Sequence, residues 1–592
     1  MISLAVTHWR SATRSTACSV WAMKGMALEP AFSPEGSAVM GTDAVLAAWR
    51  ERIAQAAEWP LPPHIPALLD AAAARYPSQT LLDFFETGKC VTYAELADRS
   101  RRIAVQLQAR GLRPGMCMAV MLPNGPHWHV LWFAALRLGL RVLPINPGYT
   151  PRELQYVLSD AQANAWWLPA ERSGVVDTLV PYPQALRRDW VFTAADGETG
   201  DSDWHTMLQG EASPSLAPEP ALEADTVANI QYTSGTTGFP KGCILTHGYW
   251  LNLVQGTRLM LLQPMKRFFT AQPFFYMDPF WQLLMTIDHG GTLTVARKIS
   301  GRRLLSWLVD HAIEWAQLPE IALKSADAVA GRALALRQVF TFGWSETSRR
   351  DFVARFGVPA TESFGMTEIG LGLAMPPEWD AADHPTSVGI PFLRRDARIV
   401  DEEGREVGPD IPGELQIRGP YMFRGYFNNP QANAGAFDGE WFRTGDTFVR
   451  DAQGFYRIVG RFKDMIRRSS ENIAAREVEA VVRALVEVLD CAAVPVKDAQ
   501  RGEEVKIMIQ LHPHLLEGGV AHTAVLSPDR LFAHCMGALA PFKVPRYVQF
   551  VDGFPRTSSN KIAKHLIAGP AIDGRMGAYD RQTKTWVGVA GN

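Results

Sequence analysis

An eleven-residue run, Tyr-Thr-Ser-Gly-Thr-Thr-Gly-Phe-Pro-Lys-Gly at residues 232–242, combines hydroxyls, glycines and one lysine. Backbone N–H groups, hydroxyls and an ammonium group are the donors that polyphosphate oxygens accept from, and glycine lets a main chain approach its ligand closely. The run is not a Walker A loop, because its lysine stands between Pro240 and Gly242. An ordinary Gly/Ser/Thr surface loop is the alternative. We expect a nucleotide-phosphate loop that uses Thr233, Ser234, Gly235, Thr236, Thr237, Gly238 and Lys241.

A second run, Thr-Glu-Ser-Phe-Gly-Met-Thr-Glu at residues 361–368, ends in a hydroxyl and a carboxylate. A carboxylate beside a phosphate is repelled unless a hard cation lies between them, so Glu368 predicts Mg²⁺. The alternative is a surface turn with a solvated glutamate. A third run, Trp-Phe-Arg-Thr-Gly-Asp at residues 441–446, presents Asp446 on a turn, where a carboxylate can accept from both hydroxyls of a ribose.

These runs, in this order between about residue 60 and about residue 570, resemble the adenylate-forming superfamily. Its members include acyl-CoA synthetases, luciferases and the adenylation domains of peptide synthetases. The resemblance implies that Thr367 contacts phosphate, that Glu368 serves the metal and that Asp446 binds ribose together with Arg461. It also implies that the nucleotide site includes Ser363, Phe364, Gly365, Met366 and an adenine wall at Gly343 and Trp344, where this chain departs from the usual Gly-Ala-Pro pattern.

The run Pro-Arg-Thr-Ser-Ser-Asn-Lys at residues 555–561 matches the C-terminal motif of the same superfamily. Adenylation brings a carboxylate against the α-phosphate of ATP, and a lysine that reaches both anions stabilises the charge of the transition state. The resemblance assigns this role to Lys561. The family usually has glycine where this chain has Asn560, a residue type that also tolerates left-handed backbone.

Three further assignments also follow from the resemblance. The loop Ser469, Ser470 and Glu471 would line the coenzyme A tunnel, with serine where the family favours glycine at 470, and Lys463 occupies the hinge position. The aromatic segment 273–281 would border the acyl pocket through Phe275 and Tyr276, although an aromatic cluster is as readily ordinary core. His247 is a third candidate for the acyl pocket, and a buried structural histidine is its alternative.

The composition is that of a folded globular protein. The 592 residues include 59 Lys+Arg and 61 Asp+Glu, and this near balance argues against a nucleic-acid binder held by bulk charge. The six cysteines are scattered without a CxxC pair, which indicates reduced thiols in a cytoplasmic protein. No apolar run is long enough to span a bilayer. A homodimer is one possible oligomeric state of the protein.

Alternating helix and strand patterns from about residue 66 predict an α/β fold with parallel or mixed sheets covered by helices. We expect helices over 65–74, 93–110 and 127–140, with a capping box from Thr92 to Glu95, and strands over 116–122 and 141–145. We expect an N-terminal extension over 1–40, disordered or misassigned, because it is acid-poor and aperiodic. A large AMP-binding domain follows over 41–460, then a small mobile α+β domain over 461–580 and a tail over 581–592.

The resulting prediction is an acyl-CoA synthetase of fatty acid metabolism. With ATP, Mg²⁺ and coenzyme A, it would convert a carboxylic acid, favoured to be a fatty acid, to acyl-AMP and then to the thioester. Three alternatives remain open. One is an enzyme that loads a separate carrier protein, another is a nucleotide-binding homologue with impaired catalysis, and the third is a plain interaction protein.

Overall fold

The computed structural model of the chain describes residues 42–195, 202–209, 216–217, 220–233, 240–342, 344, 346–379, 386–461, 465–468, 471–498, 501–539, 541, 543–556, 562–568 and 574–588. The predicted N-terminal extension, residues 1–40, lies outside these residues. So do the following predicted site residues: Ser234, Gly235, Thr236, Thr237, Gly238, Gly343, Lys463, Ser469, Ser470 and Lys561. For Arg461 and Glu471 only the backbone is described.

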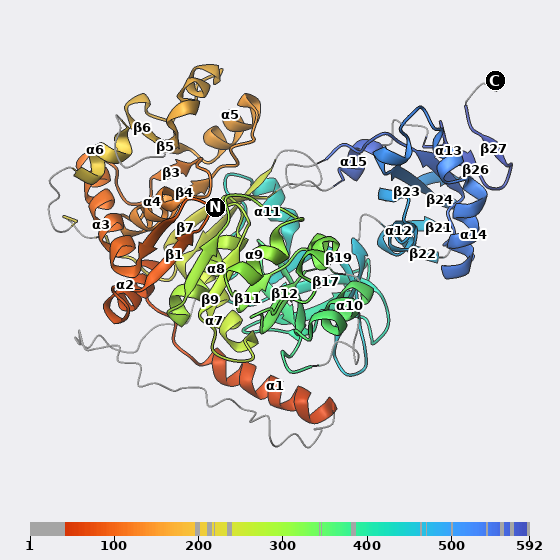
Figure 1. Cartoon of the computed structure of the whole chain (residues 1–592), viewed down its shortest axis with the longest axis horizontal. Helices are drawn as coiled ribbons and strands as arrows, with labels where there is room; N and C mark the ends of the chain where they lie inside the picture. Colours follow the sequence, from red (N-terminus) through yellow and green to blue (C-terminus); the bar gives the residue numbers. More distant parts are fainter. Residues whose placement is uncertain are drawn as a thin grey trace, which may run out of the picture.

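Two sheets of mainly parallel strands form the large N-terminal domain (Figure 1). Among the described residues, the first sheet has six strands in the order β6-β5-β3-β4-β7-β8, parallel except for the antiparallel pair β7 and β8. Its strands are β3 (Cys117–Val120), β4 (Arg141–Pro144), β5 (Ala163–Pro169), β6 (Val191–Ala194), β7 (Val227–Thr233) and β8 (Lys241–Thr246).

The second sheet has nine strands within the described residues, in the order β15-β14-β13-β12-β11-β9-β10-β1-β2. The run from β13 to β1 is parallel, so the carboxyl ends of these strands meet at one edge, where ligands of α/β proteins commonly bind. Its strands are β1 (Thr80–Phe84), β2 (Lys89–Thr92), β9 (Arg267–Thr270), β10 (Thr292–Val295), β11 (Trp315–Gln317), β12 (Gln338–Thr341), β13 (Ala360–Met366), β14 (Gly370–Ala374) and β15 (Ile390–Pro391).

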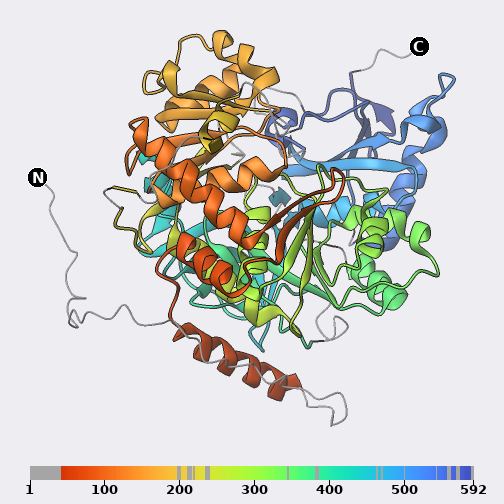
Figure 2. The same ribbon diagram turned by 60° about the vertical axis from the view of Figure 1, so that its left-hand side comes forward.

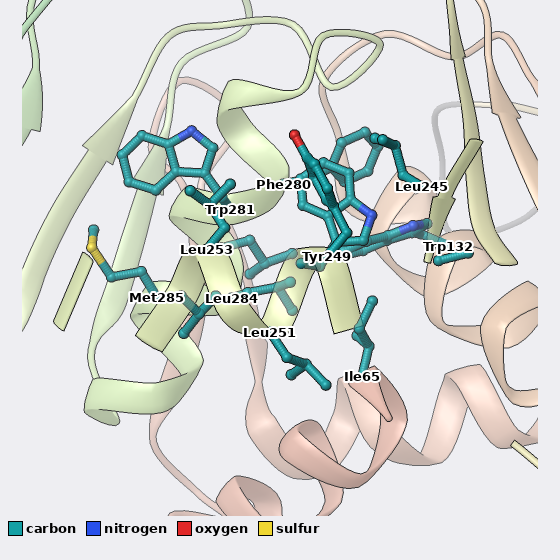
Figure 3. Close-up of a cluster of buried hydrophobic side chains, with 14 of the residues drawn as sticks. Ile65, Trp132, Leu245, Tyr249, Leu251, Leu253, Phe280, Trp281, Leu284 and Met285 are labelled. Carbon is teal, nitrogen blue, oxygen red and sulfur yellow. The ribbon is translucent and has the colours of Figure 1, made fainter. Parts of the chain in front are cut away.

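Helices fill the space between these two sheets. α4 packs on the six-stranded sheet, α8 packs on the nine-stranded sheet, and α2 contacts both helices. Large buried rings join the helices of this layer. The ring centroid of Trp132 in α4 lies 4.5 Å from that of Phe280 in α8 (Figure 3). It lies 6.2 Å from that of Trp250 in α7. The helices of this domain are α1 (Thr42–Ala57), α2 (Ile65–Arg75), α3 (Tyr93–Ala109), α4 (Pro126–Arg137), α5 (Pro151–Asp160), α6 (Asp203–Gln209), α7 (His247–Met260), α8 (Asp278–His289), α9 (Leu304–Asp310), α10 (Glu346–Phe356) and α11 (Pro430–Ala436).

Two further sheets complete the described part of the chain. A five-stranded sheet contains β16 (Asp396–Val400), β17 (Gly413–Arg418), β18 (Phe437–Asp438), β19 (Trp441–Arg450) and β20 (Tyr456–Arg461). The C-terminal domain, blue in Figure 1, has a mixed seven-stranded sheet. It is built from β21 (Met465–Arg468), β22 (Glu471–Ala474), β23 (Val488–Asp498), β24 (Gly502–Leu511), β25 (Tyr547–Phe550), β26 (Tyr579–Asp580) and β27 (Thr585–Trp586), with α12 (Ala475–Arg483), α13 (His522–Val525), α14 (Pro528–Ala538) and α15 (Lys564–Ile567).

The α/β prediction with a large and a small domain is confirmed. The capping box at Thr92 and Glu95 opens α3 as expected, and the predicted elements over 65–145 form within a few residues of their predicted bounds. The domain bounds themselves stay a prediction. β27 pairs with β26, so the stretch expected to be a tail contributes a strand to the C-terminal sheet.

Helix α1 was missed by the sequence analysis. It lies along the outside of the large domain, away from the C-terminal domain in both views (Figures 1 and 2). Trp49 is fully buried and stacks on Phe392 at 5.8 Å between ring centroids. Arg394, which has a left-handed φ of 56°, holds the end of the helix through its bonds to the carbonyls of Ala57 and Trp59.

These contacts give a prediction about truncation. A chain that starts at Met40 should keep the stability and activity of the full chain, because α1 remains. A chain that starts at residue 60 should be destabilised by on the order of 3–5 kcal/mol, the usual cost of removing a buried tryptophan. Thermal unfolding of both chains checks this. Equal stability of the two would contradict the role given to α1.

Candidate functional site

The β7–β8 hairpin presents both ends of the predicted phosphate loop. Thr233, the last residue of β7, is paired with Lys241, the first residue of β8. The Thr233 hydroxyl donates to the carbonyl of Lys241 at 3.4 Å. The two predicted phosphate ligands on either side of residues 234–239 are therefore neighbours in space.

Helix α5 braces the same hairpin from one side. The Tyr156 hydroxyl donates to the carbonyl of Pro240 at 3.1 Å, just before Lys241. The Tyr232 hydroxyl, just before Thr233, donates to Asp160 at 2.5 Å. Burial, followed by this hydrogen bond to Asp160, raises the pKa of Tyr232 far above its ordinary value, so the hydroxyl keeps its proton. One short helix thus fixes both flanks of the loop.

Glu368 and Lys241 meet at a third residue, Tyr426, which the sequence analysis did not single out. The Tyr426 hydroxyl donates to Oε1 of Glu368 at 2.9 Å. The Lys241 ammonium lies 4.9 Å from the centroid of the same ring, in range of a cation–π contact. Lys241 and Glu368, which are far apart in sequence and opposite in charge, therefore both contact the side chain of Tyr426.

The backbone around Glu368 is held by buried donors. The amide of Phe423 donates to the Glu368 carbonyl at 2.8 Å. The guanidinium of Arg395 donates to the carbonyl of Ile369 at 2.8 and 3.1 Å and to that of Pro420 at 2.6 Å. Burial lowers the pKa of Arg395 to about 10, so the group stays charged at neutral pH. Glu368 is only 7% exposed and lies on the turn that these donors hold.

The side chain of Thr367 contacts the aromatic segment 273–281. Its hydroxyl lies 3.4 Å from Sδ of Met277, the residue before α8. The ring centroids of Phe275 and Tyr276 in this segment lie 4.6 Å apart. The side-chain amide of Gln231 in β7 donates to the Phe275 carbonyl at 2.8 Å. Residues from the phosphate hairpin, the 361–368 run and the aromatic segment therefore converge.

The remaining residues of the second run lie on β13. Ser363 is buried, and within the described part of the chain its hydroxyl has no hydrogen-bond partner. Phe364 packs edge-on against Phe448 of β19 at 4.9 Å, which joins this strand to the five-stranded sheet. A Cβ at Gly365 would come within 2.7 Å of the Gly370 carbonyl, so only glycine fits there. Met366, the last residue of β13, lies between Gly365 and Thr367 and is half-buried against the core.

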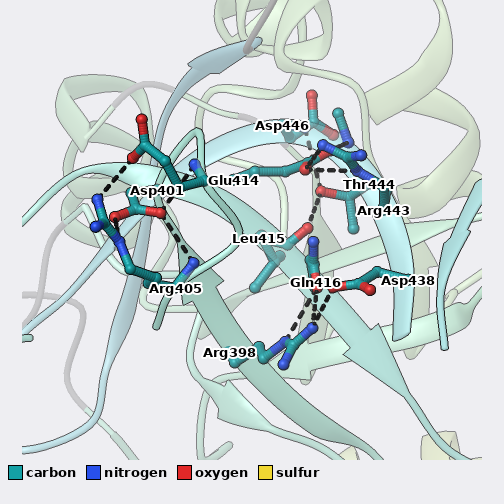
Figure 4. A network of polar contacts seen from close by, with 12 residues as sticks. Arg398, Asp401, Arg405, Glu414, Leu415, Gln416, Asp438, Arg443, Thr444 and Asp446 are labelled. Carbon is teal, nitrogen blue, oxygen red and sulfur yellow. Dashed lines mark hydrogen bonds and ion pairs between the residues drawn. The ribbon is translucent and has the colours of Figure 1, made fainter. Parts of the chain in front are cut away.

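Asp446 lies on β19 (Figure 4), and its register partner on β20 is Arg461. The Asp446 amide donates to the Thr444 hydroxyl at 3.1 Å, and Gly445 before it adopts a left-handed φ of 69°. Glu414 of β17 accepts from the Gly445 amide at 3.2 Å and from Arg443 at 2.9 Å. The turn expected from the sequence is not present, because residues 441–450 form one strand in which the pairing shifts register and Gly445 is left-handed; Asp446 is 5% exposed.

Two predicted residues are engaged in the core. The Trp344 side chain is buried, packs on Phe352 and donates to the Leu318 carbonyl at 2.9 Å, which leaves only its backbone for the expected adenine wall. His247 is also buried, and its Nδ1 accepts from the Ile65 amide at 3.2 Å. Burial lowers the pKa of His247 to about 3, so the ring is neutral. His247 thus matches the alternative reading, a structural histidine, because its ring links α2 to α7.

The described residues contain no helix long and apolar enough to cross a membrane.

Comparison with known proteins places this arrangement in a class. The family model of the AMP-binding enzymes matches residues 69–427, and the model of the AMP-binding enzyme C-terminal domain matches residues 477–561. The chain belongs to the AMP-binding enzyme family.

Individual relatives narrow the class. The chain is 31% identical over 553 residues to a long-chain-fatty-acid–CoA ligase of Escherichia coli O157:H7, covering 85% of this chain and 94% of the relative. It is 29% identical to a crotonobetaine/carnitine–CoA ligase of Salmonella agona, covering 84% and 97%. These matches identify the protein as an acid–CoA ligase of the AMP-forming type.

Solved structures share the fold. The o-succinylbenzoate CoA synthetase MenE of Bacillus subtilis, in complex with its acyl-adenylate, gives a TM-score of 0.73 at 24% identity, covering 86% of this chain and 98% of the other. ATP-bound MatB of Rhodopseudomonas palustris gives 0.72 at 25% identity, covering 85% and 98%.

Proposed function

We propose that the protein activates a carboxylic acid in two steps at one site. The carboxylate attacks the α-phosphorus of ATP, which forms acyl-AMP and releases pyrophosphate. The thiolate of coenzyme A then attacks the acyl carbon, which forms the thioester and releases AMP. The protein supplies no nucleophile, so its contribution is positioning and electrostatic stabilisation.

The observation that supports this proposal most directly is the meeting of Lys241 and Glu368 at Tyr426. A lysine and a hydroxyl at the phosphate hairpin suit the phosphates of ATP, and Thr367 lies between this group and the aromatic segment. The α-phosphate would lie near Thr367. The acid would approach from the side of Met277 and Tyr276.

A magnesium ion fits this group of residues. Mg²⁺ is usually bound by one or two carboxylates together with substrate phosphates, and the buried Glu368 carboxylate is held in place by Tyr426. Glu368 would hold the ion, which when bound would neutralise phosphate charge. Tyr426 orients the carboxylate, and Arg395 fixes the turn from which it projects.

The other nucleotide contacts follow from the positions of the motifs. Asp446, with Arg461 opposite on β20, would bind the ribose hydroxyls. Adenine would lie against the backbone at Gly343 and Trp344. Lys561 would reach the carboxylate and the α-phosphate together and offset the repulsion of the two anions.

A fatty acid is the proposed substrate class, in line with the similarity to the long-chain-fatty-acid–CoA ligase of Escherichia coli. Phe275 and Tyr276 would border its acyl group, since they adjoin Met277 and Thr367. A cytoplasmic location remains part of the proposal and is consistent with the cysteines, four of which are buried free thiols among the described residues.

The second step would use the C-terminal domain in another orientation, with Lys463 at the hinge. The coenzyme A tunnel would be lined by residues 469–471, the last of which is the first residue of β22, a strand paired with β21.

Pyrophosphate exchange over a panel of acids of increasing chain length tests the proposal. Exchange with fatty acids, followed by release of free acyl-CoA, is the expected result. Exchange without release of free thioester would favour a carrier-loading enzyme. ATP binding without exchange for any acid would overturn the proposed function.

Ser470→Gly tests the assignment of the tunnel loop. Adenylation should stay unchanged, and thioester formation should be preserved or faster, because glycine removes a hydroxymethyl group and frees the backbone. If Ser470 instead bonds pantetheine, the KM for coenzyme A should rise with the adenylation rate untouched. Separate assays of the two half-reactions distinguish these results. Altered pyrophosphate exchange without altered coenzyme A dependence would remove the loop from the second step.

A further inference from the structure

The chain on either side of residues 557–561 is closed into a hairpin-like stem. Arg556 and Ile562 form an antiparallel bridge, and the Ala563 amide donates to the Pro555 carbonyl at 2.8 Å. Lys561 directly precedes Ile562 in the sequence and therefore adjoins this stem. Contacts that hold the stem on the C-terminal domain therefore hold the backbone that adjoins Lys561 in the sequence.

A partly buried ion pair fixes the stem on its C-terminal side. The ammonium of Lys564 lies 2.6 Å from Oε1 of Glu479, a residue of α12. Glu479 is 7% exposed, and the same oxygen accepts from the Ala493 amide of β23 at 2.8 Å. The carboxylate therefore ties together α12, β23 and the segment that follows Lys561.

A second ion pair fixes the stem on its N-terminal side. Arg556 donates to Asp490 of β23 at 2.8 Å. Asp490 also accepts from the Cys491 amide at 2.9 Å and from Arg483, the last residue of α12, at 3.4 Å. Both anchors thus reach the same two elements, α12 and β23.

Stability alone does not explain a carboxylate and an ammonium in such a place. Removing two charges from water is costly, and well-packed apolar residues often replace such pairs without loss of stability. A directed charge pair does, however, fix geometry. Catalytic rates depend on geometry steeply, since a displacement of about 1 Å can cost on the order of a hundredfold.

We propose that the Glu479–Lys564 ion pair is a positioning device for Lys561, supported by the Asp490–Arg556 pair. The proposal rests on the role given to Lys561 under the proposed function. Glu479 and Lys564 act through the stem and touch neither substrate. Their effect should therefore fall on adenylation, the only step assigned to Lys561.

Glu479→Gln is the main test variant. Glutamine has the same shape and can still accept from the Ala493 amide, but it lacks the charge that holds Lys564. Pyrophosphate exchange should fall about tenfold or more. Thioester formation from supplied acyl-AMP should stay within about twofold of wild type, a split that a purely structural defect would not produce.

The same helix supplies a matched control. Glu477, also on α12, pairs with Lys543 at 2.7 Å, but this pair is more exposed and neither residue adjoins Lys561. Glu477→Gln should leave both half-reactions within about twofold of wild type, as exposed ion pairs contribute little. A similar loss of adenylation in both variants would overturn the proposal.

A second pair of variants covers the case in which Glu479→Gln does not fold. Lys564→Met should slow adenylation selectively, whereas Lys564→Arg should retain most of it because arginine keeps the charge. Equal losses in the two half-reactions, or no loss with Lys564→Met, would overturn the proposal.

Failure of the proposed function would look different. If wild type shows no exchange with any acid, or if Lys561→Ala spares adenylation, the fault lies with the function and not with the ion pair.

Discussion

Lys561→Ala is expected to lower the rate of acyl-adenylate formation by two to three orders of magnitude, while thioester formation from supplied acyl-AMP stays largely intact. The lysine is assigned to the charge that develops as the carboxylate meets the α-phosphate. Removing one such group typically costs about 3–4 kcal/mol of transition-state stabilisation. Pyrophosphate exchange measures the first half-reaction, and single-turnover reaction of acyl-AMP with coenzyme A measures the second.

A matched control lies in the same domain. Lys497 is an exposed lysine of β23, and Lys497→Ala should leave both half-reactions unchanged. An equal loss of both half-reactions in Lys561→Ala would contradict the assignment, because it would indicate damage to the domain as a whole. Loss of only the second half-reaction would exchange the roles of Lys561 and the 469–471 loop.

Glu368→Gln is expected to slow the magnesium-dependent reaction by on the order of a hundredfold, with little change in folding. The variant removes the charge that a hard cation needs but keeps an oxygen that can accept from Tyr426. The measurement is pyrophosphate exchange across a magnesium titration, with thermal unfolding in parallel.

Tyr426→Phe is the companion variant for Glu368→Gln. It keeps the carboxylate charge and removes only the hydrogen bond that orients it, so we expect a smaller loss than in Glu368→Gln. A wild-type rate for Glu368→Gln at every magnesium concentration would show that another residue serves the metal.

The sequence predicted those parts of the fold that depend on local patterns. The sequence predicted the capping box at Thr92 and Glu95 and the alternation of strands and helices over 65–145. Both could be predicted because helix caps and hydrophobic periodicity are set by residues close in the chain. Helix α1 was missed although Leu46, Trp49 and Ala56 follow a helical spacing. The reason why this polar segment forms a helix lies in two tertiary contacts: Trp49 packs on Phe392, and Arg394 donates to the Ala57 carbonyl.

The same distinction applies to the candidate site. The 361–368 run could be recognised because its groups adjoin one another in the chain. Tyr426 could not, since it lies 58 residues from Glu368. It reaches that residue only because the segment around 424–427 pairs with β8, as in the contact between Cys243 and Tyr426. The orientation of a side chain could not be predicted from the sequence either. For this reason the sequence left His247 open to assignment to the acyl pocket or to the core.

The fixed flanks of the phosphate hairpin have a consequence for the entropy of ATP binding. Thr233 and Lys241 are paired across the ladder, and α5 holds the residues beside both of them, so the two ends of the intervening segment are already brought together in the free protein. The closure entropy of a loop is spent when its ends meet, which here occurs during folding. If this hairpin holds the phosphates of ATP as proposed, that part of the entropy cost does not fall on nucleotide binding. The affinity of the proposed site for ATP would then depend in part on Tyr156 and Tyr232, which hold the flanks of the hairpin.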